Sequence, residues 1–126
     1  MINLKFLLAG NATFTIANPE GKRYTFKITY SKGIKKHFAY VLTAPETYTY
    51  VGMVVDSRVV LTKKSKYTAF SKLFNVLNCA FDIASGKKQL KEGYFLEHMG
   101  KCGRCGRDLT TPESINRGLG PICFSK

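Results

Sequence analysis

The sequence predicts an α+β fold that combines a curled antiparallel sheet of about five strands, one packed amphipathic helix and a C-terminal zinc-knuckle module. Five short segments of alternating polarity are joined by short turns, which is typical of antiparallel strands. One longer segment repeats apolar residues at helical spacing. Three of the four cysteines lie in the last part of the 126-residue chain. We expect one compact unit, with sheet and helix in residues 1–93 and the zinc-binding module in residues 94–126.

The first segment, Ile2 to Ala9, is short and apolar and is followed by Gly10 and Asn11. This pattern predicts one or two helical turns. Strands are then expected at residues 12–17, 24–30, 37–43, 48–55 and 58–62, separated by turn-forming residues.

The second predicted strand alternates most clearly, with one face formed by Tyr24, Phe26, Ile28 and Tyr30. In the third strand, Phe38, Tyr40 and Leu42 share a face. Because a buried sheet face needs such a period of two, we interpret the tyrosines in phase with Phe26 and Phe38 as core residues.

The helix is predicted from Lys66 to about Ala84, with Ser65 as its N-cap and Gly86 ending it. Its apolar positions follow the spacing of a helix that lies on a sheet: Phe70, Leu73, Phe74, Leu77, Phe81 and Ala84. A polar loop follows, and "YFLEH" then predicts a short extended lead into the cysteine motif.

The chain carries 20 lysines and arginines against 8 acidic residues, a formal net charge of +12. A basic surface of this kind attracts polyanions, and nucleic acid is the expected partner, although charge alone also serves solubility. The basic residues cluster at expected turns and element ends, which makes the following residues candidates for nucleic-acid binding: Lys32, Lys35, Lys36, Lys63, Lys64, Lys66, Lys101, Arg104 and Arg107.

The cysteine motif predicts a structural zinc site with about one Zn²⁺ per chain. Cys102 and Cys105 form a C-x-x-C-G knuckle, and Cys123 follows a Gly-Pro turn that returns a third thiolate. The fourth ligand is either His98, four residues before the knuckle, or Cys79 in the predicted helix. His98 is favoured because it is close to the knuckle in sequence. A redox role for the C-x-x-C is disfavoured because no βαβ pattern surrounds it.

The sequence does not predict an enzyme. It contains no P-loop and no G-x-G-x-x-G motif. Three thiolates would also make zinc a poor Lewis acid, because they donate so much charge to the ion. We expect no membrane partner, because no run of 18 apolar residues occurs. A cytoplasmic location is expected because the N-terminal apolar patch is too short for a signal-peptide core.

The segment "HMGKCGRCGRDLTTPESINRGLGPIC" resembles the C-terminal motif of an uncharacterised family of small proteins from bacteriophages and mobile elements. "LLAGNATFTI", "GKRYTFKI" and "YTYVG" resemble its amino-terminal part, so the resemblance covers most of the chain. It implies a phage origin, and hence the host cell cytoplasm as the location. It also implies a zinc-ribbon-like module in which His98, Cys102, Cys105 and Cys123 match the motif, whereas Cys79 has no counterpart. No activity is established for this family.

Two functions from different classes remain open. The first is non-enzymatic nucleic-acid binding through the basic loops and the rim of the knuckle. Five tyrosines could serve as stacking faces, although a core position is the favoured interpretation of each: Tyr24, Tyr30, Tyr40, Tyr48 and Tyr50. The second is inhibition of a host protein or nucleoprotein, such as a defence nuclease or a polymerase. The kind of nucleic acid is not predicted.

Overall fold

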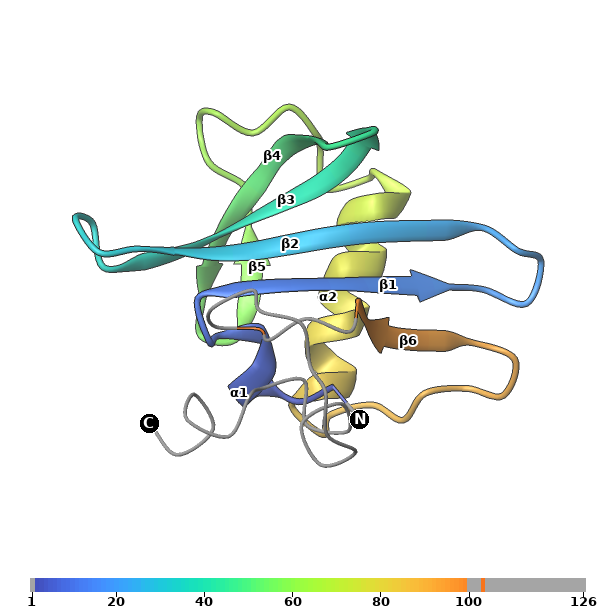
Figure 1. Cartoon of the computed structure of the whole chain (residues 1–126). Helices are drawn as coiled ribbons and strands as arrows, with labels where there is room; N and C mark the ends of the chain where they lie inside the picture. Colours follow the sequence, from blue (N-terminus) through green and yellow to red (C-terminus); the bar gives the residue numbers. More distant parts are fainter. Residues whose placement is uncertain (1, 100–102, 104–126) are drawn as a thin grey trace.

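The computed structural model describes residues 2–99 and 103, and it shows one curved six-stranded sheet with two helices (Figure 1). The strands lie in the order β5-β4-β3-β2-β1-β6, and all neighbours are antiparallel. In chain order the elements are α1 (Leu4–Leu7), β1 (Asn11–Ala17), β2 (Arg23–Ser31), β3 (Lys36–Ala44), β4 (Thr47–Val55), β5 (Arg58–Val60), α2 (Lys72–Ala84) and β6 (Phe95–His98).

This architecture confirms the predicted α+β class, with a curled antiparallel sheet and one packed amphipathic helix. All five predicted strands are present, with ends that differ by one or two residues. The extended lead before the cysteine motif is a sixth strand, β6, which pairs with β1. Most of the predicted zinc module, residues 100–102 and 104–126, lies outside the described residues.

The N-terminal helix α1 forms as predicted. Its N-cap is Asn3, whose side-chain oxygen accepts a hydrogen bond of 3.0 Å from the backbone N–H of Phe6. Phe6 and Leu7 are fully buried, so this short helix is held by its packing rather than by its length.

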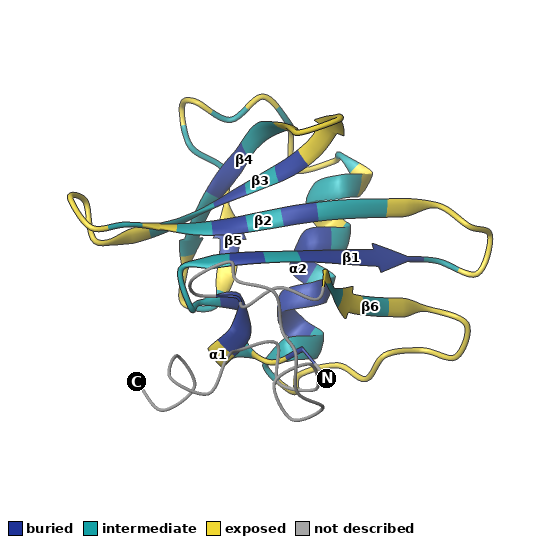
Figure 2. Cartoon of the chain, in the orientation of Figure 1, coloured by how far each residue is buried: buried dark blue, intermediate teal, exposed yellow. Residues whose placement is uncertain are grey.

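The hydrophobic core lies between the sheet and the helices (Figure 2). The largest fully buried side chains of the sheet are Phe14, Phe26, Ile28 and Val51, and those of α2 are Leu77 and Phe81. Burial of such aromatic and branched side chains supplies most of the stability of a domain of this size.

The predicted start of the long helix is wrong. The helix begins at Lys72 rather than Lys66, because the serine hydroxyls before it hold turns instead. Ser65 Oγ accepts from the Thr62 N–H at 2.8 Å, and Ser71 Oγ accepts from the Thr68 N–H at 3.1 Å. Phe70 therefore precedes the helix and is 94% exposed. The other predicted apolar positions, Leu73, Phe74, Leu77, Phe81 and Ala84, do belong to the core or pack against it.

The predicted apolar set of β2 faces the core, whereas the predicted apolar set of β3 faces away from it. In β2, Phe26 and Ile28 are buried, as predicted. In β3, the buried residues are Ala39 and Val41, because Ala39 pairs with Ile28 and paired residues share a face. The interpretation of Tyr40 as a core residue is therefore wrong. It is also wrong for Tyr30, which lies at the end of β2 and is 41% exposed, whereas Tyr24 does pack against the core.

Strands β4 and β5, at one edge of the sheet, pack closely against each other at Gly52. Gly52 of β4 is buried, and any Cβ atom there would collide with the Val60 carbonyl oxygen of β5. The strands are joined by Asp56 and Ser57, which both adopt positive φ angles of 51° and 64°. This is the type I′ geometry of a two-residue hairpin and confirms the predicted tight connection.

Candidate functional site

The outer face of strands β2–β4, which points away from the helices, carries a cluster of aromatic side chains. Alternation places Phe38, Tyr40 and Leu42 of β3 on this face, opposite the buried Ala39 and Val41. The register continues the cluster into β4, because Tyr40 pairs with Tyr50 and Leu42 pairs with Tyr48. We call Phe38, Tyr40, Tyr48 and Tyr50 the outer aromatic face.

These rings contact one another without forming a closed core. The Tyr40 and Tyr50 rings lie edge to face, with centroids 5.7 Å apart and planes at 65°. The Phe38 and Tyr50 centroids are 6.1 Å apart. Tyr50 is further fixed by a 2.9 Å hydrogen bond between its hydroxyl and that of Thr62. All four rings are half-buried, so each is fixed by its neighbours yet keeps part of its surface open.

Lysines flank the outer aromatic face. Lys27 of β2 pairs in register with Tyr40, and its ammonium lies 5.3 Å from the centroid of the Tyr48 ring. Lys64 lines a shallow hollow of about 350 Å³ together with Phe38, Tyr40 and Tyr50. Lys36 lies on the same side of β3 as Phe38 and Tyr40. No acidic residue occurs in β2, β3 or β4, so no carboxylate of these strands offsets these charges.

The structure brings only part of the predicted basic residues together. Lys64 lines the hollow beside Phe38, Tyr40 and Tyr50, whereas Lys36 begins β3 at the β2–β3 hairpin and shares only the side of that strand with Phe38. Lys32 and Lys35 lie at the tip of the β2–β3 hairpin, and Lys63 and Lys66 lie in the β5–α2 connection. All four are exposed, and Figure 1 shows these two segments at different ends of the sheet. Lys101, Arg104 and Arg107 lie outside the described residues.

Sequence reasoning missed Lys27 and the orientation of the outer aromatic face. The alternation of β3 shows that Phe38 and Tyr40 share a face, but it does not show which face is buried. The residues on the other face of β3 could have indicated the buried side. Ala39 and Val41 are small and branched residues that fit beneath a packed helix.

The candidate zinc ligand His98 lies at the end of β6, paired with Phe14 of β1. Its ring centroid is 5.6 Å from that of Phe6 in α1. Gly103, which follows Cys102, packs against the same ring, since a Cβ atom there would lie 2.6 Å from Phe6 Cδ1. The Gly103 carbonyl also accepts a 2.7 Å hydrogen bond from the Asn11 N–H. The Phe6 ring therefore contacts both the His98 ring and Gly103, the residue that follows Cys102 in the sequence.

The other predicted metal ligands cannot be placed in this way. Cys102, Cys105 and Cys123 lie outside the described residues. Within residues 2–99 and 103, no group of three or more potential metal ligands occurs. His37 is engaged elsewhere, because its Nε2 donates a 2.8 Å hydrogen bond to the Leu8 carbonyl.

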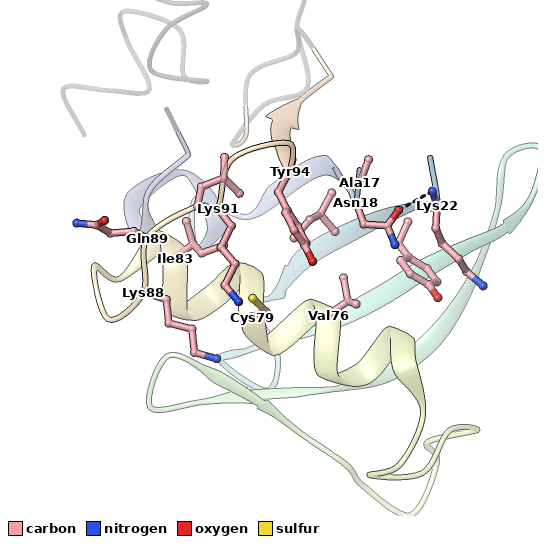
Figure 3. Close-up of a pocket in the computed structure, with 13 residues that line it drawn as sticks. Ala17, Asn18, Lys22, Val76, Cys79, Ile83, Lys88, Gln89, Lys91 and Tyr94 are labelled. Atoms are coloured by element: carbon pink, nitrogen blue, oxygen red, sulfur yellow. Dashed lines mark hydrogen bonds between the residues drawn. The ribbon is translucent and has the colours of Figure 1, made fainter. Parts of the chain in front are cut away.

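Cys79, the alternative fourth ligand, is a half-buried free cysteine on α2. It lines a pocket with residues of β1, β2 and the segment before β6, including Ile16, Tyr24 and Tyr94 (Figure 3). Neither His98 nor Gly103 lines this pocket. The two candidates thus have separate surroundings, and of the two only His98 lies against the Phe6 ring that Gly103 also contacts.

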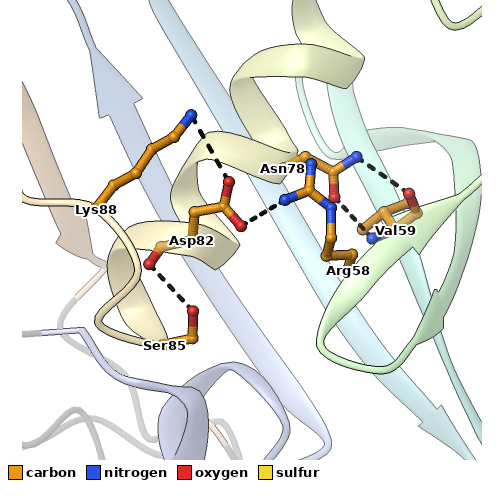
Figure 4. Close-up of polar contacts among 6 residues, drawn as sticks. All are labelled: Arg58, Val59, Asn78, Asp82, Ser85 and Lys88. Carbon is orange, nitrogen blue, oxygen red and sulfur yellow. Dashed lines mark hydrogen bonds and ion pairs between the residues drawn. The ribbon is translucent and has the colours of Figure 1, made fainter.

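A buried polar cluster between α2 and β5 was not predicted (Figure 4). The Asn78 side chain accepts from the Val59 N–H at 2.7 Å and donates to the Val59 carbonyl at 3.1 Å. The Asp82 carboxylate accepts from Arg58 at 2.6 Å and lies 3.7 Å from the Lys88 ammonium. Because both side chains are satisfied by protein partners, we interpret the cluster as the connection of α2 to β5 rather than as a functional site.

Comparison with known proteins adds one finding. Residues 95–126, about a quarter of the chain, match a family of unknown function, DUF6011. This match fits an uncharacterised family at the position of the cysteine motif and includes β6 with His98. No curated protein and no solved structure matches the chain. Among the described residues, no helix is long and apolar enough to cross a membrane.

Proposed function

We propose that this protein is a non-enzymatic nucleic-acid-binding protein that holds a single strand on its outer aromatic face. The observation that carries the proposal is the half-exposed cluster of Phe38, Tyr40 and Tyr50, with Lys64 on the rim of the same hollow. Several half-buried rings that gather on one solvent face beside lysines fit a ligand with flat apolar surfaces and negative charge.

Single-stranded nucleic acid has the chemistry that this face fits. Unpaired bases stack on aromatic rings, and each such contact contributes about 1–3 kcal/mol. The lysines lie beside the rings, where they can contact the phosphates between successive bases. A duplex hides its base faces in its own stack, so we expect it to bind more weakly than a single strand at the same salt concentration.

The proposal includes a C-terminal zinc module of phage type. Cys102, Cys105, Cys123 and His98 would hold one structural Zn²⁺ and leave no open position on the ion. The packing of His98 and Gly103 on Phe6 supports the choice of His98, because it places this histidine and the residue after Cys102 on one ring. The rim residues Lys101, Arg104 and Arg107 would then add phosphate contacts.

Binding to labelled oligonucleotides tests the first part. We expect a single strand to bind with a logarithmic affinity that falls with the logarithm of the salt concentration, by about 0.7 per phosphate contact. Tyr40→Leu keeps apolar volume but removes the stacking ring, and should weaken binding by roughly tenfold. Tyr40→Phe keeps the ring and serves as the matched control. Equal affinity of the Leu and Phe variants would contradict the proposed site.

Elemental analysis tests the zinc module. The purified chain should carry about one zinc ion, and His98→Ala should lower zinc affinity whereas Cys79→Ser should not. Zinc loss in Cys79→Ser, with full retention in His98→Ala, would show that Cys79 is the fourth ligand.

A second candidate function is binding and inhibition of a host protein or nucleoprotein, and Phe70 favours it. This side chain is 94% exposed, and its turn is held by hydrogen bonds of Thr68 with the Phe70 N–H at 3.3 Å and with Ser71 at 3.1 Å. A fixed, exposed phenylalanine is typical of an anchor in a protein interface. If Phe70→Ser leaves single-strand affinity unchanged but abolishes binding of an isolated host partner, the second candidate holds for that partner.

A further inference from the structure

A second cavity, of about 240 Å³, lies where the β1–β2 hairpin meets α2 and the segment before β6 (Figure 3). Apolar side chains from these elements line most of it, among them Ile16, Val76, Ile83 and Leu90. None of its lining residues belongs to the outer aromatic face. It is therefore separate from the proposed nucleic-acid interface.

The polar groups around this cavity are mainly cationic. Lys22, Lys88 and Lys91 line it, and no acidic residue does so among the described residues. Lys88 is held by Asp82 at 3.7 Å, which leaves its charge partly offset. Lys22 and Lys91 form no ion pair within the described part of the chain. The Lys22 ammonium instead lies 5.6 Å from the centroid of the Tyr24 ring.

The close-up shows how the wall of the cavity is arranged. Lys91 and Tyr94 extend from the segment before β6 toward α2, where the Cys79 thiol faces them (Figure 3). The cavity thus has an apolar floor and at least two cations at its edge. A ligand that fits both features has an apolar body and one negative group.

We propose that this cavity binds a small organic anion, with a short aliphatic or aromatic body and a single carboxylate or similar group. The apolar body would lie against Ile16, Val76 and Ile83, and the anion would lie at the edge beside the Lys91 ammonium, near Cys79, whereas Lys22 extends at the opposite end of the cavity (Figure 3). A nucleotide fits less well, because its ribose hydroxyls would lose water without gaining partners on an apolar floor.

Two fluorescent probes that differ in one charged group test this proposal on the full-length protein. The probes are 8-anilinonaphthalene-1-sulfonate, which is an anion, and N-phenyl-1-naphthylamine, its neutral counterpart. The double variant Lys22→Gln, Lys91→Gln should weaken binding of the anion by roughly fivefold to tenfold, while affinity for the neutral probe changes less than about twofold. The matched control Lys32→Gln, Lys35→Gln removes the same charge from the β2–β3 tip and should change neither. Equal weakening of anion binding by both double variants, or no weakening by either, would overturn the assignment of the site.

Competition and pocket filling complete the experiment. Decanoate should displace the anionic probe, and adenosine monophosphate should not. Displacement by the nucleotide alone would overturn the proposed class of ligand.

The variant Cys79→Trp should block binding of both probes if circular dichroism shows a native fold. Probe binding to that folded variant would count against the cavity as the binding site. The lysine variants decide the question if Cys79→Trp does not fold. Tyr40→Leu should leave probe binding unchanged, since a loss there would place the probe on the outer aromatic face.

Discussion

The inner and outer faces of the same sheet use aromatic residues for opposite purposes. Phe14 and Phe26 are fully buried, with ring centroids 5.7 Å apart, and form the middle of the core. Tyr40 and Tyr50 are as close, at 5.7 Å, yet they lie on the solvent face beside Lys27. Ring contacts alone therefore do not distinguish a core from a binding surface, whereas burial and neighbouring charge do.

The strongest test of this comparison is the removal of an inner ring. Phe26→Ala should lower the free energy of unfolding by about 3–5 kcal/mol, because it removes buried apolar area and leaves a cavity between sheet and helix. Chemical denaturation would measure the change. A loss below about 1 kcal/mol would mean that neighbouring side chains fill the space left by the ring. The inner face would then not be tightly packed.

A polar inner residue should be almost as important. Asn78→Ala should cost about 1–3 kcal/mol, because it leaves the Val59 N–H and carbonyl without their partners beneath α2. Asn78→Asp is the informative companion, since it keeps the acceptor for the N–H but places a carboxylate next to the carbonyl. If both variants denature like the wild type, water replaces the side chain and the buried interpretation fails.

The outer face should show the reverse pattern. Tyr40→Ala should lower the free energy of unfolding by only about 0.5–1 kcal/mol, the range of a cross-strand pair on an exposed face. Its effect on single-strand binding should be much larger, as proposed above. A stability loss as large as that of Phe26→Ala would erase the difference between the two faces.

The smallest effect is expected at a position that belongs to neither face. Ser57 adopts a φ of 64° in the β4–β5 turn, a region that glycine occupies without strain. Ser57→Gly should therefore raise the unfolding free energy by about 0.5 kcal/mol and leave ligand binding unchanged. A thermal melt would show this as a small upward shift, and a decrease would indicate that the hydroxyl has a structural partner.

The sequence predicted the class of the fold well because local patterns determine it. The alternation of β2 and the turn residues after each strand identified the sheet, and helical spacing identified Leu77 and Phe81 as core residues. The start of α2 was not predictable, because Ser65 and Ser71 both have the chemistry of an N-cap and only the fold shows which turn each one holds.

The candidate site was predicted less well, since it depends on pairing between distant strands. The basic loops were recognised as such, but Lys27 and the outward direction of Tyr40 follow from the register Ile28–Ala39, which local sequence does not encode. For the metal ligands, proximity in sequence favoured His98, and that choice stays a prediction because Cys102, Cys105 and Cys123 lie outside the described residues.

The pairing of β6 with β1 has a consequence for the order of folding. Thr15 and Met99 contact each other across 84 positions of sequence, whereas β1–β4 are joined by short hairpins. Closing so long a loop is entropically costly, so we expect the hairpins to form first and β6 to dock in a late, slower step. Pulsed hydrogen exchange during refolding would then show protection of β2–β4 amides before those of β6, and simultaneous protection would contradict this order. Because the family match begins at β6, the part of it that the structure describes would join the sheet only after the hairpins have assembled.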